Sequence, residues 1–330
     1  MKRIKQILKD IAAGTILIVP VVTCVNCEKG NICKDEDIIN GWGQPVISVA
    51  CMREEPRHGA ELVSQCLLGE PIAIMMESGE WLDIKTSEGY RGWVNQSSIA
   101  RKSEAEMKQW RQSSRLVVDS PTEIRVYKND NLAGEVITDL VDGCIVEYSL
   151  TADTNVVTVT LPDGRSGYAD AGSFIEIAEW SNQEYDAEKI ISRAYALTGI
   201  PYLWGGLSTK SMDCSGLIKL CYRANGIIVP RDASQQADCG TTVNKEDLKK
   251  GDLLFFGNKE TRRVTHVGIY EGNDMYIHCS GRVRRNSLDP SSPEYMDKYY
   301  LSSRRIHGET EDDGAVKVKN HPWYFQMTDN

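Results

Sequence analysis

The stretch Met212-Asp-Cys-Ser-Gly216 decides the organisation of the C-terminal part of the chain, because it opens a predicted helix with a cysteine. Over residues 214–224, the apolar side chains Leu217, Ile218 and Cys221 recur at helical spacing. Backbone N–H groups at a helix N-terminus favour an anion, so a thiolate is stabilised there. A thiolate that acts as a nucleophile also needs a base within reach, and a third group that fixes the tautomer of that base.

Two histidines downstream can meet this need. His266 and His278 fall in neighbouring predicted strands joined by a turn around Gly272. If the strands pair symmetrically about Gly272, the two histidines stand directly opposite each other with Cβ atoms ~5 Å apart. A loop with an even number of residues would place them on opposite faces. Single cysteines and histidines are usually structural, but their conjunction predicts Cys214 as nucleophile, His266 as base and His278 as the group that orients the base.

The elements around these residues indicate an α+β domain. A second helical pattern covers residues 186–198 and ends at Gly199. Three strands then follow the helix of Cys214, at residues 253–257, 264–271 and 275–280. Helices followed by an antiparallel run are typical of an α+β fold.

The N-terminal half has a different texture, with short strands separated by polar turns. The first group ends in a polar link that we expect to be helical, over residues 104–112. A second group with the same texture follows, up to Trp180. Residues 88–93 (EGYRGW) resemble residues 163–168 (DGRSGY), where a polar turn precedes a glycine and an aromatic residue. This weak repeat predicts a tandem pair of small all-β barrels.

Composition limits the classes of function. The chain has 330 residues, of which 41% are hydrophobic and 26% charged, which suits two or three globular domains. A net charge of −9 argues against nucleic-acid binding and fits a cationic or amine-bearing ligand. Three cysteines near the N-terminus lack a second ligand pair at zinc-site spacing, so we expect neither a metal nor a cofactor. We also expect a monomer.

The N-terminal segment resembles an export signal. Four basic residues within the first nine positions precede an apolar run over residues 11–22, which is too short to span a membrane comfortably. Val22-Thr-Cys24 is similar to a lipoprotein cleavage site, which would leave Cys24 lipidated and the protein attached to a membrane. We expect an exported protein, either periplasmic or anchored as a lipoprotein. The alternative is an N-terminal helix of a cytoplasmic protein.

Residues 186–306 resemble the NlpC/p60 family of bacterial cell-wall cysteine peptidases, which have a reduced papain-like fold. The matching segments are Pro201-Tyr-Leu-Trp-Gly-Gly206, Asp213-Cys-Ser-Gly216, Pro230-Arg-Asp-Ala-Ser-Gln-Gln236, Lys250-Gly-Asp-Leu-Leu-Phe-Phe256 and His266-Val-Gly-Ile-Tyr270. The resemblance implies that Cys214 attacks an amide carbon, that His266 takes its proton and that His278 holds His266.

The upstream part resembles the bacterial SH3-like domain of γ-D-glutamyl-L-diamino acid endopeptidases, in Glu61-Leu-Val-Ser-Gln65, Leu68-Gly-Glu70 and Gly89-Tyr-Arg-Gly-Trp93. In such enzymes the first barrel narrows the cleft, so that a stem peptide with a free L-Ala amine fits. The resemblance implies that the amine meets Asp232, Glu61 and Tyr90. It further implies that the L-Ala-γ-D-Glu part is shaped or contacted by Tyr202, Trp204, Asp213 and Ser215.

Each of these substrate residues also has a structural interpretation. Asp232 with Gln235 forms a capping-box pattern, which is compatible with ligand contact. Tyr202 and Trp204 are also suited to a core, and Glu61 to a solvated strand edge. Ala233 stands where related enzymes can carry Ser.

The expected division of the chain is a signal or lipoprotein signal at 1–23, a linker at 24–45, SH3-like domains at 46–112 and 113–180, and the peptidase domain at 181–330. Three functions remain open. The first is hydrolysis of the γ-D-Glu to L-Lys or diaminopimelate bond in muropeptides with a free L-Ala amine, in murein recycling. The second is a wall hydrolase that accepts glycan-linked stems. The third is a binding protein that holds a wall peptide without catalysis.

Overall fold

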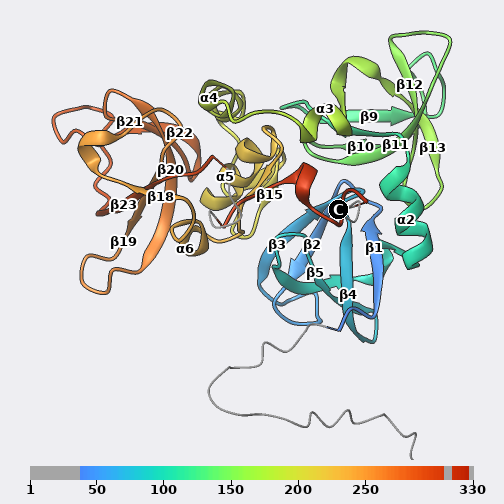
Figure 1. Cartoon of the computed structure of the whole chain (residues 1–330), viewed down its shortest axis with the longest axis horizontal. Helices are drawn as coiled ribbons and strands as arrows, with labels where there is room; N and C mark the ends of the chain where they lie inside the picture. Colours follow the sequence, from blue (N-terminus) through green and yellow to red (C-terminus); the bar gives the residue numbers. More distant parts are fainter. Residues whose placement is uncertain (1–37, 308–313, 327–330) are drawn as a thin grey trace, which may run out of the picture. The chain divides into compact units, whose positions relative to one another are not determined.

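The computed structural model describes residues 38–307 and 314–326, which belong to one compact unit (Figure 1). The expected signal segment and Cys24 lie outside these residues. Within the described ranges, no helix is both long and apolar enough to cross a membrane.

The first part of the unit is a seven-stranded antiparallel sheet with strand order β3-β2-β6-β5-β4-β1-β7. Its strands are β1 (Gly41–Pro45), β2 (Val49–Arg53), β3 (Leu62–Leu67), β4 (Ile72–Ser78), β5 (Trp81–Lys85), β6 (Arg91–Asn95) and β7 (Ile99–Lys102). Helix α2 (Glu104–Gln112) follows, and it begins where the Ser103 hydroxyl accepts a hydrogen bond from the Glu106 N–H. The helical link thus has the bounds that the sequence predicts.

A second seven-stranded sheet follows, with strand order β10-β9-β13-β12-β11-β8-β14. Its strands are β8 (Arg115–Val118), β9 (Ile124–Tyr127), β10 (Val136–Leu140), β11 (Ile145–Leu150), β12 (Val156–Thr160), β13 (Ser166–Asp170) and β14 (Phe174–Glu176). Adding seven to each strand number of the first sheet reproduces this order, so the topology repeats as the weak sequence repeat predicts. Gly89 and Gly164, both with φ of 86°, occupy equivalent turns. The sequence predicts two small barrels. The structure shows two antiparallel sheets, and each strand order begins and ends with an edge strand.

The C-terminal part combines helices with a six-stranded antiparallel sheet of order β18-β23-β19-β20-β21-β22. Its helices are α3 (Ile177–Ser181), α4 (Ala187–Ala196), α5 (Cys214–Arg223) and α6 (Ala233–Gln236). The sheet strands are β18 (Thr241–Val243), β19 (Leu253–Gly257), β20 (Val264–Gly272), β21 (Met275–Ser280), β22 (Arg282–Ser287) and β23 (Tyr300–Arg305). Two short pairs, β15 (Leu207–Ser208) with β16 (Ser211–Met212) and β17 (Ile227–Ile228) with β24 (Val316–Lys317), complete it. The apolar faces of α4 and α5 and the inner side chains of β19–β21 form one core.

The segment after residue 313, in which the sequence pattern predicts nothing, is part of the core. Tyr324 is buried in a cluster with Trp110 and Trp180, and its carbonyl accepts a 2.9 Å hydrogen bond from Arg115 Nη1. The Trp323 ring meets the Trp42 ring edge-on at 5.0 Å. The segment therefore holds the two N-terminal sheets and the start of the peptidase part together.

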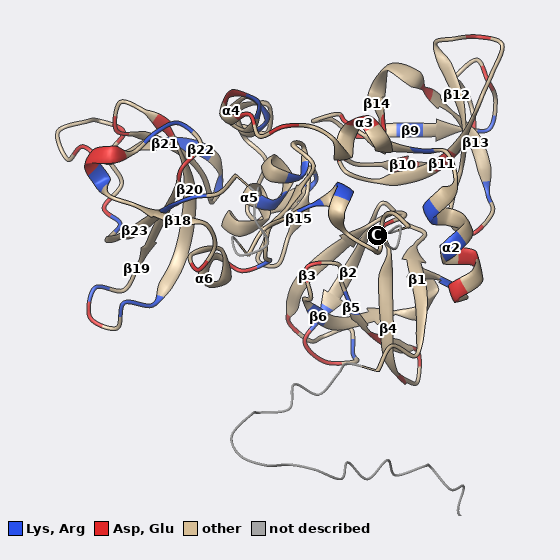
Figure 2. Ribbon diagram, viewed as in Figure 1, with Lys and Arg blue, Asp and Glu red and all other residues tan. Residues whose placement is uncertain are grey.

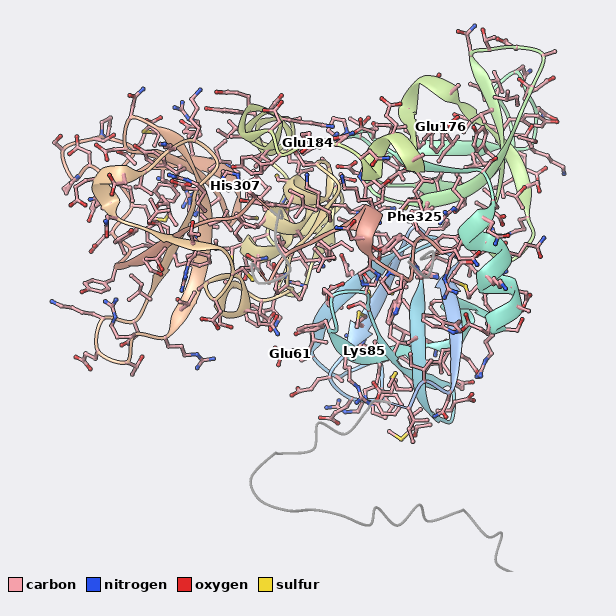
Figure 3. The ribbon with its side chains drawn as sticks, viewed as in Figure 1. Glu61, Lys85, Glu176, Glu184, His307 and Phe325 are labelled. Atoms are coloured by element: carbon pink, nitrogen blue, oxygen red, sulfur yellow. The ribbon has the colours of Figure 1, made fainter. Side chains whose placement is uncertain are left out.

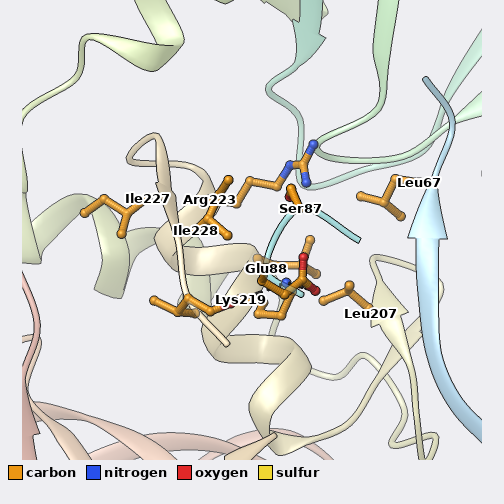
Figure 4. Close-up of a pocket in the computed structure, with 10 residues that line it drawn as sticks. Leu67, Ser87, Glu88, Leu207, Lys219, Arg223, Ile227 and Ile228 are labelled. Atoms are coloured by element: carbon orange, nitrogen blue, oxygen red, sulfur yellow. Dashed lines mark hydrogen bonds and ion pairs between the residues drawn. The ribbon is translucent and has the colours of Figure 1, made fainter. Parts of the chain in front are cut away.

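Helix α5 is fixed against the first sheet by buried polar contacts. Lys219 Nζ lies 2.6 Å from Glu88 Oε1, and Figure 4 shows this pair in a small cavity of about 20 Å³. The Gln65 side chain accepts a 2.8 Å hydrogen bond from the Leu207 N–H. These contacts hold the helix that begins with Cys214 at a fixed position beside β3.

Candidate active site

Cys214 is the first residue of α5, as the sequence predicts. Asp213 caps the helix, and its Oδ1 accepts a 2.7 Å hydrogen bond from the Gly216 N–H. Burial raises the pKa of the Cys214 thiol to about 11, and the Asp213 charge adds to the rise, while hydrogen bonds from the Val267 and Ser215 backbone N–H groups oppose it. The sulfur thus lies beside the strand residue that follows His266.

The two histidines share a face of the sheet, but the predicted register is wrong by two residues. His278 pairs with Gly268, whereas His266 is diagonal to it. The turn is a two-residue loop, Asn273-Asp274, whose positive φ values of 52° and 58° suit a tight hairpin. The pairing slips by one residue between Tyr270 and Gly272, which is a β-bulge. A two-residue loop alone would place the two histidines on opposite faces of the sheet. The extra residue of the bulge returns both side chains to the same face.

A chain of hydrogen bonds sets the tautomers of both rings. His266 Nε2 lies 2.6 Å from His278 Nδ1, and His278 Nε2 lies 2.8 Å from Asn286 Oδ1. The Asn286 amide is oriented because its Nδ2 donates to the Glu294 carbonyl at 2.6 Å. Since Asn286 Oδ1 accepts, His278 carries its proton on Nε2 and accepts at Nδ1. His266 then donates from Nε2, which leaves its Nδ1 unprotonated and able to act as a base.

Burial keeps both imidazoles neutral. The pKa of His266 is lowered to about 2 and that of His278 to about 4, chiefly by burial; the charge of His278 contributes to the first value, and the charges of Arg284 and Lys298 contribute to both. With Cys214 as a thiol at neutral pH, the resting pair is uncharged.

Asp213 and Ser215, which form the floor of the site, both contact a buried arginine that the sequence did not predict. Arg231 is 1% exposed, and its Nη2 lies 2.6 Å from Asp213 Oδ2. Its Nη1 donates to the Ser215 hydroxyl at 3.0 Å, and its Nε donates to the Ser64 hydroxyl on β3 at 2.9 Å. Asp213 and Ser215 are thus engaged within the protein and shape the floor. The sequence could have predicted this pair. Arg231 directly follows an apolar run, which indicates burial, and a buried arginine requires a carboxylate partner.

Above this floor lies a cavity of about 510 Å³ beside Cys214. It is lined by Glu61, Tyr90, Tyr202, Trp204, Asp213, Cys214, Ser215 and Asp232 among others, so eight of the ten sequence-predicted site residues meet there. His266 and His278 are buried in the sheet behind it. Asn286 and Arg231 are the residues that the sequence prediction lacks.

Two contacts join the first sheet to the peptidase part at this cavity. The Trp204 indole N–H donates to Glu61 Oε1 at 2.7 Å, and Trp204 is 60% exposed, so it is no core aromatic (Glu61 is labelled in Figure 3). The Tyr90 hydroxyl forms a hydrogen bond with Asp232. Burial and the Asp232 charge raise the pKa of Tyr90 to about 12, so the phenol stays protonated.

Asp232 and Tyr202 each have a structural contact and also line the cavity, as the sequence allows. The Gln235 side chain accepts a 2.9 Å hydrogen bond from the Asp232 N–H, which is half of the predicted capping box, while Asp232 also lines the cavity. Tyr202 packs against the core and lines the cavity as well. Burial and the nearby Cys214 raise the pKa of Tyr202, so its hydroxyl is a proton donor beside the sulfur.

Comparison with known proteins agrees with this arrangement. Residues 199–305 match the NlpC/P60 family, and residues 52–99 match the bacterial dipeptidyl-peptidase Sh3 domain. Dipeptidyl-peptidase 6 of Lysinibacillus sphaericus is 31% identical over 76% of this chain and 93% of its own length. Gamma-D-glutamyl-L-lysine dipeptidyl-peptidase of Bacillus subtilis is 31% identical over 74% of this chain and 81% of its own.

The fold has a solved counterpart. The crystal structure of an NlpC/P60 family protein from Bacillus cereus has a TM-score of 0.70 at 22% identity, and the match covers 81% of this chain and 99% of that one. With a helix-opening cysteine, a histidine pair and this likeness over most of its length, the chain belongs to the NlpC/P60 family of cysteine peptidases.

Proposed function

We propose that the protein hydrolyses the bond between γ-D-Glu and L-Lys or diaminopimelate in peptidoglycan stem peptides that begin with a free L-Ala amine, and so releases L-Ala-γ-D-Glu. The observation that carries the proposal is that two carboxylates, Glu61 just before β3 and Asp232 just before α6, line the cavity beside Cys214, where Tyr90 is hydrogen-bonded to Asp232. We assign the amine to these carboxylates, the acidic end of the cavity. A desolvated ammonium requires carboxylate partners, and two are provided here. The names of the relatives from L. sphaericus and B. subtilis support a dipeptidyl-peptidase activity.

The proposed chemistry proceeds in two steps. Cys214 attacks the γ-carbonyl carbon of D-Glu while His266 Nδ1 takes the thiol proton, and the Ser215 N–H and the Tyr202 hydroxyl are donors near the developing oxyanion. The imidazolium then protonates the leaving amine as the C–N bond breaks, which leaves a thioester. Water, deprotonated by His266, hydrolyses the thioester and regenerates the thiol. His278 holds the His266 ring in position throughout.

The free-amine requirement follows from closure of the cleft. In the proposed acidic end of the cavity, Trp204 donates a hydrogen bond to Glu61 and Tyr90 is hydrogen-bonded to Asp232, and all four residues line the cavity. A glycan-linked stem has an amide in place of the amine and would bring the bulky sugar into this end. The substrate is then a released muropeptide, which suits murein recycling.

Three further assignments belong to the proposal. The SH3-like domains comprise residues 46–112 and 113–180, and the peptidase domain comprises residues 181–330. The relatives' names point to peptidoglycan substrates, so we propose that the protein works in the cell envelope as a monomer. Attachment through lipidated Cys24 is part of the same proposal.

The test compares L-Ala-γ-D-Glu-L-Lys with its N-acetylated form. We expect the wild type to cleave the free-amine peptide with a kcat/KM at least about 100-fold higher, because acetylation removes the charge-assisted contacts of the ammonium with Glu61 and Asp232. Glu61→Gln should raise KM for the free-amine peptide, and Cys214→Ala should abolish turnover. Equal cleavage of both peptides would remove the amine requirement.

A further inference from the structure

The sheet face that carries the histidines also carries cations. Arg284 on β22 pairs directly with His278, so its side chain lies on the same face as the imidazole. Lys298 follows in the loop between β22 and β23, and its charge acts with that of Arg284 to lower the pKa of both histidines. Figure 2 shows the basic stretch of β22 in blue.

Neither cation has a carboxylate partner among the described residues. Arg284 Nε is buried without a hydrogen-bond partner, and Nη2 has only a 4.0 Å contact with Met296 Sδ within the described ranges. The neighbouring Arg285, by contrast, donates to Glu271. Arg284 as a whole is partly exposed, so an anion from solvent can reach the accessible edge of its guanidinium and supply an acceptor for this cation.

The carboxylates of the site and these two cations lie on different elements. Glu61 and Asp232 line the cavity beside Cys214, as does the cation Arg263, whereas Arg284 lies on the strand next to His278. The whole chain carries a net charge of −9, so unpaired cations here do not reflect a general excess of basic residues. A ligand that suits this arrangement has an amine at one end and a carboxylate at the other.

We infer that Arg284 and Lys298 form a subsite for a carboxylate on the amino acid that leaves when the peptide bond breaks. The inference rests on the proposed function and adds a specificity to it. The carboxylate has two possible sources, the α-carboxylate of a terminal third residue and the side-chain carboxylate of diaminopimelate. Bound there, it offsets two charges that oppose the imidazolium formed on His266, so it favours both binding and proton transfer.

The test uses L-Ala-γ-D-Glu tripeptides whose third residue is L-Lys, L-Lys amide, diaminopimelate, or diaminopimelate amidated at the α-carboxylate, at the side-chain carboxylate or at both. For the wild type we expect at least one acid form to have a kcat/KM about tenfold or more above its amide. The singly amidated forms identify which carboxylate is recognised.

Arg284→Met and Lys298→Met should each reduce this acid-to-amide ratio, while kcat for the fully amidated peptide should rise, because the removed cation no longer opposes the imidazolium on His266. Arg284→Lys should retain part of the ratio. Arg101→Met is the matched control, because Arg101 is an exposed arginine that pairs with Glu77 on the first sheet. Lys298 lies in a loop, where a substitution disturbs the sheet less than one on β22. Lys298→Met therefore provides the test if Arg284→Met does not fold.

Binding of the peptides to the Cys214→Ala variant distinguishes failure of the carboxylate subsite from failure of the proposed hydrolysis. If the acid peptides bind about tenfold tighter than their amides while the wild type cleaves none of them, the carboxylate subsite stands and the proposed hydrolysis fails. If the wild type cleaves acid and amide peptides equally, and both bind Cys214→Ala equally, the subsite is refuted and the proposed hydrolysis stands.

Discussion

Replacing Asn286 by Leu tests whether a hydrogen-bond chain sets the protonation of the catalytic base. Asn286 accepts from His278 Nε2 at 2.8 Å and is 9% exposed, so water does not readily replace it. In Asn286→Leu the His278 Nε2–H loses its acceptor, which costs the productive tautomer about 1–3 kcal/mol. We expect kcat to fall by about 5- to 160-fold. KM should change little, because the buried Asn286 side chain is engaged with His278 and the Glu294 carbonyl.

The assay combines steady-state kinetics with nitrogen-15 NMR of the imidazole rings. In the wild type, the ring shifts should report a proton on Nε2 of both His266 and His278. In Asn286→Leu, the Nδ1–H tautomer of His278 should become populated. Asn286→Asp retains an acceptor and should keep the wild-type tautomers and most of kcat.

The same wild-type kcat and tautomers in Asn286→Leu would refute the reasoning. A fall in kcat with no change of tautomer would also refute it, because the loss would then reflect damage to packing. Thermal unfolding of both variants provides the control for folding.

Three other predictions follow from the site and the core. Because burial raises the pKa of Cys214 to about 11, its alkylation by iodoacetamide in the free enzyme should accelerate continuously from pH 7 to pH 10, as followed by peptide mass spectrometry; a plateau near neutral pH would indicate a thiolate at rest. Arg231→Met leaves the Asp213 carboxylate buried and unpaired, so urea unfolding should show a loss of about 3–5 kcal/mol that Arg231→Met/Asp213→Asn partly restores; a loss below about 1 kcal/mol would contradict the buried pair. Tyr324→Ala removes a side chain that is 1% exposed, so the free energy of unfolding should fall by about 3 kcal/mol, and an unchanged melting temperature would exclude a core role for the C-terminal segment.

The sequence predicts the helices and central strands well because their patterns are local. Helix α2, strands β19 and β21 and the start of α5 at Cys214 coincide with the expected bounds. Apolar spacing and capping residues determine these elements without help from distant contacts. The C-terminal segment around Tyr324 was not predicted, because its place is set by aromatic contacts with residues far away in the chain.

The site was predictable in its chemistry and less so in its geometry. The parity of His266 and His278 was expected, but the register depends on a bulge after Tyr270 that no local pattern signals. The sequence did not predict Asn286 and Arg231, because each contacts another residue of the site and has no sequence motif of its own. Asn286 reaches His278 across a strand pair, and Arg231 reaches Asp213 through a loop, so only the folded chain brings them to the site.

Trapping the acyl-enzyme tests the central claim, that the Cys214 sulfur attacks the γ-carbonyl of D-Glu, most directly. Wild-type protein mixed with L-Ala-γ-D-Glu-L-Lys and quenched in acid should gain the mass of one L-Ala-γ-D-Glu acyl group, located by peptide mapping on Cys214. The same adduct should be absent from Cys214→Ala. Turnover of the peptide by Cys214→Ala at the wild-type rate would contradict the account.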